Sequence, residues 1–377
     1  MAACGSGGRT AVHEGCAARV GVPRTWHPAG AAARAAAPAG TDRAVPVGTG
    51  LCAEPPRGEV PWTHGGTAPP GRGWAEEEVS DEGVPVPGLV VVGVDGSESS
   101  LAAVEVAARE ARLRGARLRV VHAFIWPVMP VPLGPSPLGP PDGGLQNMAD
   151  RLVADAVERA RSVEPEVEVS SEVVTGEPLT VLEAESRAAE LVVVGSRGMG
   201  VFVGLLVGST AVHLAAHGRC PVLVVRGKPE PEGPIVLGVD GSAAGEKAVD
   251  FAFAEAELRK APLVALHAWT TWNAPLPEPQ DAAAPYANPP GTLAQTEERL
   301  LAEAIAGHKE RHPDVVVEHR VVHGGAREAL IEASRSAQLL VVGARGRGGF
   351  TGLLLGSVSQ ALLHHSHCPI AVVRGKK

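Results

Sequence analysis

Short apolar runs alternate with longer amphipathic stretches along the chain from residue 88 onward. In the first half of this region, the apolar runs that we expect to form strands lie at 89–94, 118–124, 166–174, 190–195 and 221–226. Stretches with helical periodicity lie between them, at 98–114, 146–163, 178–188 and 208–217. Continuous apolar strands between amphipathic helices predict a parallel sheet that is covered on both faces. Right-handed crossovers then give a doubly wound α/β sandwich, in which ligands bind at the carboxyl ends of the strands.

The second half of this region repeats the first. Residues 91–97 (Val-Val-Gly-Val-Asp-Gly-Ser) match 236–242 (Val-Leu-Gly-Val-Asp-Gly-Ser), and the Cys-Pro-apolar run at 220–228 matches 368–376. The period is far longer than that of solenoid repeats, so the pattern indicates a duplicated domain. We expect two tandem sandwiches, each with a five-stranded parallel sheet. Their predicted bounds are 88–228 for the first domain, 229–233 for a Pro-rich linker and 234–377 for the second domain.

Residues 1–87 differ from the rest of the chain in composition. They are rich in Gly, Ala and Pro and show little apolar periodicity. Such a segment buries too little apolar surface to offset the entropy of ordering it, so we expect it to be disordered. The alternative is a start site that has been placed too early, with Val79, Val84 or Val86 as the true first residue.

Composition and charge narrow the class of protein. The net charge of −8 argues against a general nucleic-acid binder. The five cysteines form neither a CxxC pair nor a disulfide framework, as is usual in a reducing cytosol. The chain begins without a signal pattern, and its apolar runs are too short or too interrupted to span a membrane. We therefore expect a cytoplasmic protein whose partners include neither nucleic acid nor membrane.

A glycine-rich pattern follows the fourth apolar run of each half. The first copy is Gly195-Ser196-Arg197-Gly198, nine residues, and Gly208-Ser209-Thr210; the second is Gly343-Ala344-Arg345-Gly346, nine residues, and Gly356-Ser357. Glycines admit close approach of backbone N–H groups to an anion, a helix N-terminus adds a favourable dipole, and Arg197 and Arg345 offer positive charge. A plain loop with a serine cap would look similar, but two copies with the same spacer favour a phosphate cradle. Neither copy has the lysine of a Walker A loop.

Three further pairs of residues fall at strand ends. Asp95 and Asp240 could hydrogen-bond a nucleoside, hold a metal through water, or cap a helix. Gly176 and Gly324 could admit a ribose, or serve as turn glycines with positive φ. We expect the histidines at 122 and 267 to be packed and hydrogen-bonded rather than catalytic. The sequence contains no apparent Ser-His-Asp set, HExxH motif or paired carboxylates, which weighs against a dedicated hydrolase.

These motifs resemble the universal stress protein family in its tandem, ATP-binding form. The resemblance covers residues 89–375 and rests on Val-Gly-Val-Asp-Gly-Ser, on Gly-x2-Gly-x9-Gly-Ser and on the Cys-Pro-apolar last strand. It implies a five-stranded parallel sheet in each half and bound ATP with Mg2+ or Mn2+. It also implies pairing through the last strand, either in a homodimer or between the two halves.

The resemblance also implies the residues of two nucleotide sites. In the first half it places adenosine and ribose against Asp95, Ala123 and Gly176, and ribose and phosphates against Val194, Gly195, Gly198, Gly208, Ser209 and Thr210. The matching positions in the second half are Asp240, Ala268, Gly324, Val342, Gly343, Gly346, Gly356, Ser357 and Val358. Two features depart from the family pattern: Ala123 and Ala268 are smaller than the expected valine, and Val358 replaces a hydroxyl.

The sequence therefore predicts a cytoplasmic, ATP-binding regulator of the stress response that is not an enzyme. A slow ATPase or autokinase that uses the same residues is the first alternative. A scaffold that keeps the fold but binds no nucleotide is the second. The sequence identifies no metal ligands and no regulatory partner.

Overall fold

The computed structural model describes residues 88–125, 144–198, 207–270, 292–347 and 354–375. The chain divides into two units, Met1–Val79 and Ser80–Lys377, and all the described residues belong to the second. The predictions of a disordered or wrongly started segment at 1–87 fall outside the described residues.

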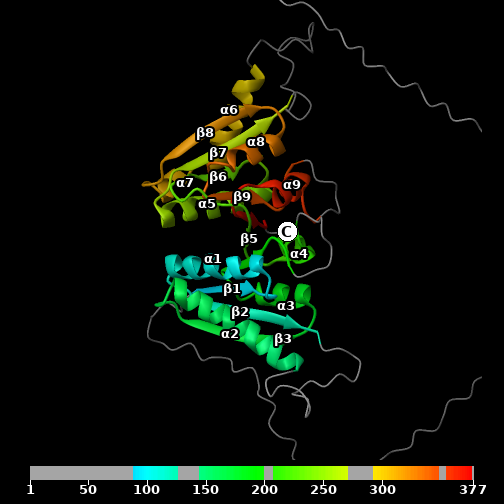
Figure 1. Cartoon of the computed structure of the whole chain (residues 1–377). Coiled ribbons are helices and arrows are strands. Elements are labelled where there is room, and N and C mark those ends of the chain that lie inside the picture. Colours follow the sequence, from blue (N-terminus) through cyan, green and yellow to red (C-terminus); the bar gives the residue numbers. More distant parts are fainter. Residues whose placement is uncertain (1–87, 126–143, 199–206, 271–291, 348–353, 376–377) are drawn as a thin grey trace, which may run out of the picture. The chain divides into compact units, whose positions relative to one another are not determined.

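The described strands form one sheet whose order is β3-β2-β1-β4-β5-β10-β9-β6-β7-β8 (Figure 1). The strands of the first half are β1 (Leu89–Gly93), β2 (Arg117–Phe124), β3 (Val169–Thr175), β4 (Leu191–Gly195) and β5 (Val222–Val225). Those of the second half are β6 (Ile235–Gly238), β7 (Leu263–Trp269), β8 (Val317–His323), β9 (Leu339–Gly343) and β10 (Ile370–Val373). Pairing is parallel within each half, as expected for strands connected by helices. The predicted fold class is confirmed.

The two halves join through their last strands. β5 and β10 pair antiparallel, with Leu223 opposite Ala371, so that two five-stranded sheets become one ten-stranded sheet. Both strands are apolar and almost entirely buried. Because each would otherwise be an exposed edge with unpaired backbone groups, their pairing satisfies both edges at once.

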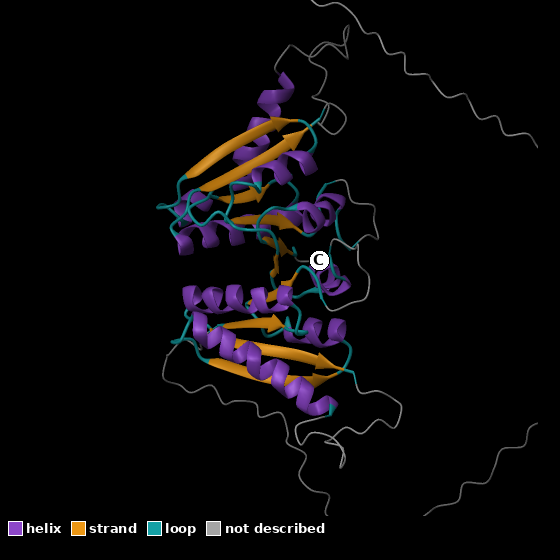
Figure 2. Ribbon diagram, viewed as in Figure 1, coloured by secondary structure: helices purple, strands orange, loops and turns teal. Residues whose placement is uncertain are grey.

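Helices cover both faces of the sheet (Figure 2). The helices of the first half are α1 (Glu98–Arg114), α2 (Leu145–Val163), α3 (Pro178–Glu185) and α4 (Ser209–His217). Those of the second half are the 3-10 turn η1 (Ala243–Gly245), α5 (Glu246–Arg259), α6 (Thr292–Ile305), α7 (His308–Arg311), α8 (Ala326–Ala333) and α9 (Ser357–His365). Residues of α1, α2, α5 and α6 share one apolar cluster, and residues of α3, α4, α8 and α9 share the other. The predicted helix at 178–188 ends earlier, at Glu185.

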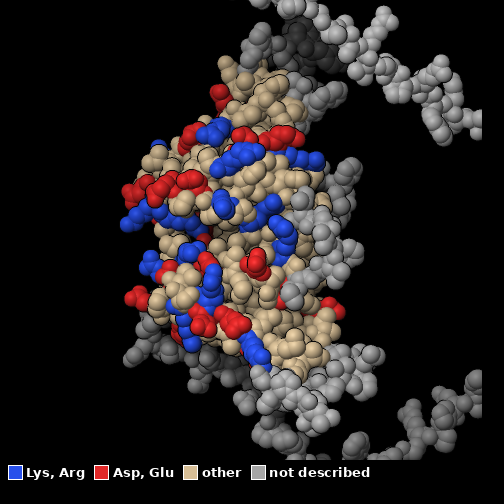
Figure 3. Space-filling model, in the orientation of Figure 1, with Lys and Arg blue, Asp and Glu red and all other residues tan. Residues whose placement is uncertain are grey.

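Charged side chains are mixed in sign over the face that Figure 3 draws. Basic and acidic groups are interspersed there, and neither sign gathers into a broad stripe. Among the described residues, no helix is long and apolar enough to cross a membrane.

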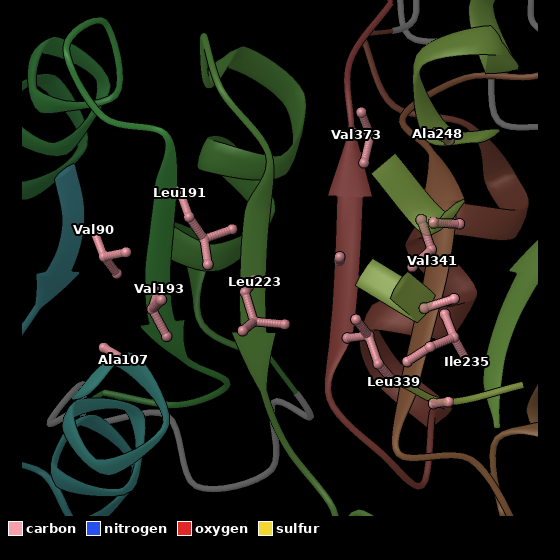
Figure 4. Close-up of a cluster of buried hydrophobic side chains, with 14 of the residues drawn as sticks. Val90, Ala107, Leu191, Val193, Leu223, Ile235, Ala248, Leu339, Val341 and Val373 are labelled. Atoms are coloured by element: carbon pink, nitrogen blue, oxygen red, sulfur yellow. The ribbon is translucent and has the colours of Figure 1, made fainter. Parts of the chain in front are cut away.

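Small and branched side chains build the core. Val90, Leu191 and Val193 of neighbouring strands share one buried cluster with Ala107 of α1, and all are at most 1% exposed (Figure 4). Aromatic residues make up only 3% of the chain, so close packing depends on Val, Leu and Ala. Alanines on α1 let that helix lie close to the sheet, which fixes the position of its N-terminus at the carboxyl ends of the strands.

Candidate nucleotide site

An aspartate follows the first strand of each half. Oδ1 of Asp95 accepts hydrogen bonds from the backbone N–H (3.0 Å) and the hydroxyl (2.7 Å) of Ser97. Asp240 makes the same two bonds, at the same distances, with Ser242. Ser97 also caps α1 by accepting a hydrogen bond from the N–H of Ser100. The serine rather than the aspartate therefore caps α1, and the same serine engages Oδ1 of Asp95.

The glycine-rich loop meets this aspartate in both halves. Oδ2 of Asp240 accepts a hydrogen bond from the backbone N–H of Arg347 at 2.7 Å. A Cβ at Gly346 would overlap the same Oδ2, and a Cβ at Gly198 would overlap Oδ2 of Asp95. The second glycine of each Gly-x2-Gly motif is therefore required by close approach to a side chain from another strand end.

The helix that follows each loop begins at a glycine. Gly208 is the N-cap of α4 and Gly356 the N-cap of α9, and neither helix has a side-chain cap. The N–H of Gly208 donates to Ser196 O at 2.8 Å and that of Gly356 to Ala344 O at 2.7 Å, so these two N–H groups are engaged. The remaining N–H groups of each first turn have no partner within the helix and favour an anion.

The loop and the helix start lie against one another in the first half. A Cβ at Gly208 would lie 3.8 Å from both the Arg197 Cα and the Gly198 N. The Arg197 side chain is exposed, and that of Arg345 is partly exposed. The structure thus brings Asp95, Gly198 and Gly208 together at the carboxyl edge of the sheet, where the sequence predicted a cradle.

The other predicted site residues are turn glycines, apolar residues packed in or against the core, or residues at a helix start. Gly176 and Gly324 have φ of +152° and +156°, so the turn interpretation explains both without a ligand. They end β3 and β8, which β2 and β7 separate from the strands that carry the aspartates. Val194 and Val342 are buried in the core, whereas Ala123 and Ala268 are partly buried against it. The helix-start residues Ser209 and Ser357 are exposed, whereas Thr210 and Val358 are half-buried.

Two residues near the first cradle were missed in the sequence. Oγ of Ser99 accepts a hydrogen bond from the Arg197 N–H at 3.2 Å, and its counterpart in the second half is an alanine. Arg226, at the end of β5, donates to the carbonyl of Leu363 in α9 of the other half. Burial lowers the pKa of the Arg226 guanidinium, and the charge of Arg197 lowers it further, so the two arginines influence one another. Comparison of the two copies could have identified Ser99, because it departs from the repeat.

The strand-end histidines are packed as expected. His122 Nδ1 donates to Val94 O at 2.8 Å, and His267 Nδ1 donates to Val239 O at 2.7 Å. His267 also contacts Glu297, through Nε2 and Oε2, at 2.7 Å. The part of the chain that the structure describes holds no group of three or more His, Cys, Asp or Glu arranged for a metal.

The fold and these strand-end motifs define a tandem, doubly wound α/β protein with one glycine-rich loop in each half. The sequence matches the universal stress protein family twice, over residues 89–226 and 233–374. The chain belongs to this family.

Relatives agree with this assignment. Universal stress protein Rv2005c of Mycobacterium tuberculosis is 39% identical over 232 residues, which cover 59% of this chain and 76% of that protein. A universal stress protein of Mycolicibacterium smegmatis is 39% identical over 235 residues, covering 60% of this chain and 74% of the relative. The crystal structure of a universal stress protein from Archaeoglobus fulgidus superposes with a TM-score of 0.51 at 17% identity, covering 76% of this chain and 98% of that one. This last similarity supports the fold alone.

Proposed function

We propose that the chain binds ATP at two sites and acts as a nucleotide-dependent regulator in the stress response. The observation that carries the proposal is the meeting of three segments in each half: the aspartate after the first strand, the Gly-x2-Gly loop and the uncapped helix start. Backbone N–H groups and glycines at a helix N-terminus suit phosphate oxygens. The second copy of the same geometry supports a second site.

The residues at the cradle fit a triphosphate. Gly208 leaves room beside Arg197, and the exposed arginine supplies positive charge. Mg2+ or Mn2+ would accompany the nucleotide chiefly through its phosphates and water, as Mg2+ does in proteins. The carboxylate at the second cradle, Asp240, already accepts hydrogen bonds at both oxygens, so it would act on the nucleotide through the position of the loop.

The hydrogen bonds that Asp240 already accepts favour a protein that binds ATP over one that hydrolyses it. A general base must have a free lone pair within hydrogen-bond reach of the attacking water. Oδ1 of Asp240 accepts two hydrogen bonds from Ser242 and Oδ2 accepts one from the N–H of Arg347, so three of its four acceptor sites are engaged. We therefore infer a regulator without fast chemistry, in which nucleotide occupancy changes the surface offered to protein partners. A slow ATPase or autokinase remains the enzymatic alternative, and a scaffold without nucleotide is the other.

The nucleotide content of the purified protein tests the proposal. The protein is denatured, and the released nucleotides are separated by ion exchange and counted per chain. ATP close to two per chain is the expected result. Single-turnover incubation with ATP and Mg2+ then separates the alternatives: ADP or phosphorylated protein would favour the enzyme. No nucleotide, together with no thermal shift on adding ATP and Mg2+, would support the scaffold.

A further inference from the structure

The two halves differ beside the strand end that carries the aspartate. In the second half, His267 of β7 and Glu297 of α6 form a buried pair, and the two residues are 5% and 2% exposed. Leu152 of the first half corresponds to Leu300 of the second. Each leucine lies against the glycine that follows the strand-end aspartate, which is Gly96 for Leu152 and Gly241 for Leu300. Three residues before these leucines stand Ala149 and Glu297. The first half therefore has an alanine where the second has the glutamate.

The geometry of the pair requires a proton. Val239 O can only accept a hydrogen bond, so His267 Nδ1, 2.7 Å away, must carry hydrogen. Nε2 of the same ring lies 2.7 Å from Glu297 Oε2, and both atoms present lone pairs unless a proton lies between them. The Val239 carbonyl thus fixes the hydrogen on Nδ1 of His267, and Glu297 fixes the orientation of the ring through Nε2.

The pair connects directly to the second cradle. Val239, whose carbonyl His267 holds, immediately precedes Asp240, and Asp240 holds the loop through the N–H of Arg347. Among the described residues, Oε1 of Glu297 has no hydrogen-bond partner although it is buried. Retaining a half-satisfied carboxylate in a core is unfavourable for stability alone, which points to a role at the site.

We propose that Glu297 is a positioning residue of the second nucleotide site. It acts through His267 and the Val239 carbonyl to hold Asp240 against the glycine-rich loop. The first site has no equivalent, since Ala149 cannot orient His122 in this way. The inference rests on the proposed ATP binding and adds that the two sites are held in place differently.

The test reads the second site alone. All variants are made in a Gly208→Asp background, in which the added carboxylate should repel phosphate at the first site. The fold should tolerate this change, because Asp is a favoured N-cap and a Cβ at Gly208 would meet no heavy atom closer than 3.8 Å. In this background, Glu297→Ala should weaken the affinity for ATP with Mg2+ about five-fold, the worth of one hydrogen bond of ordinary strength. Glu297→Gln should restore affinity to within about two-fold, because its amide can donate to Nε2. Glu298→Ala, an exposed acidic residue on the same helix, should leave the affinity unchanged.

A spectroscopic measurement separates positioning from general stability. In protein labelled with 15N-histidine, the proton between Nε2 of His267 and Glu297 should be protected from exchange, and this protection should be lost in Glu297→Ala. ATP should shift the signal of the proton on His267 Nδ1. Equal ATP affinity in Glu297→Ala and the background protein would overturn the inference while leaving ATP binding intact. If Glu297→Ala does not fold, the Gly208→Asp protein provides the test. A His267 Nδ1 proton signal that does not shift when ATP is added would then overturn the inference. Failure of the wild-type chain itself to bind ATP would instead contradict the proposed function, and the inference with it.

Discussion

The Asp240 carboxylate lies directly on Gly346. Its Oδ2 accepts the N–H of Arg347 at 2.7 Å, and a Cβ at Gly346 would overlap the same oxygen. The first half repeats the approach between Asp95 and Gly198. The end of one strand thus holds the loop that follows another, and a glycine is required where they meet.

Gly346→Ala should disturb the second site without unfolding the protein. The methyl group would push the Asp240 side chain away and break its bond to the Arg347 N–H. Because the displaced group is the end of a half-buried side chain and not backbone, the fold should tolerate the change. We expect ATP affinity at the second site, measured by calorimetry in the Gly208→Asp background, to fall about ten-fold. Asp240→Asn keeps one acceptor oxygen and presents an amide donor in place of the other, so it should also weaken the affinity. Unchanged affinity in Gly346→Ala would show that this contact does not position the site.

Glu110→Gln should destabilise the junction between the halves. Glu110 and Arg114 of α1 and Glu255 and Arg259 of α5 form a closed ring of ion pairs, with side chains between 3% and 11% exposed. Neutralising Glu110 leaves two buried arginines to share one buried glutamate, Glu255, at a cost of about 3 kcal/mol. Denaturant unfolding should show this loss of free energy of unfolding. The matched control is Glu105→Gln, whose arginine partners are more than half exposed and which should cost at most about 1 kcal/mol. Equal effects of the two variants would contradict the account.

The thiols of Cys220 and Cys368 should resist alkylation in the folded protein. Burial raises the pKa of Cys220 to about 12 and that of Cys368 to about 11. The thiolate is the reactive form, so iodoacetamide at pH 8 should label both slowly, and quickly once urea unfolds the chain. The raised pKa values also mean that the folded state keeps these protons longer than the unfolded state. Their stabilising contribution is therefore present below about pH 9 and lost at higher pH. Fast labelling of either thiol in the native protein, read by peptide mass spectrometry, would argue against this burial.

His308 should make the second half less stable in acid. The residue is 4% exposed, stacks on Phe253 at 5.0 Å and accepts a hydrogen bond from Arg311 at 2.9 Å. Burial lowers the pKa of His308, and the charge of Arg311 lowers it further. The unfolded state then binds the proton first, so stability falls as the pH drops below about 6.5.

His308→Gln should remove part of this slope. Urea midpoints at pH 7.5 and 5.5 should lie closer together in the variant than in the wild type. His319→Gln, at an exposed position, serves as the control and should keep the wild-type difference. A slope that is the same in all three proteins would contradict the assignment.

The sequence predicted the strands well, because buried parallel strands are continuous apolar runs. Observed strands of the first half lie within three residues of their predicted bounds. The end of α3 was harder to predict from sequence. The Ser186 hydroxyl donates to Glu183 O, and the chain leaves the helix there in a turn. The joining of the halves could not be chosen from sequence alone. Because the Cys-Pro-apolar strand occurs in both copies, pairing within one chain and pairing between two chains look the same.

The candidate site was predictable where it repeats and obscure where it does not. Glycines and aspartates recur at matching positions, and close approach explains why. Ser99 and Glu297 each occur in one copy only, and their meaning depends on contacts with distant residues. The register of Glu297 was further hidden because the second copy carries extra residues before α6. Single-copy residues of this kind need coordinates to be recognised.

The most direct test of the central claim is the amount of ATP bound per chain, measured by equilibrium dialysis with Mg2+. The proteins compared are the wild type, Gly208→Asp, Gly356→Asp and the double variant. A Cβ at Gly356 would come no closer than 3.4 Å to a neighbour, so both substitutions suit their helix starts while repelling phosphate. The account predicts close to two, one, one and no ATP per chain, with thermal stability retained throughout. Two ATP retained by the double variant, or none bound by the wild type, would contradict the claim that the repeated cradle is the nucleotide site.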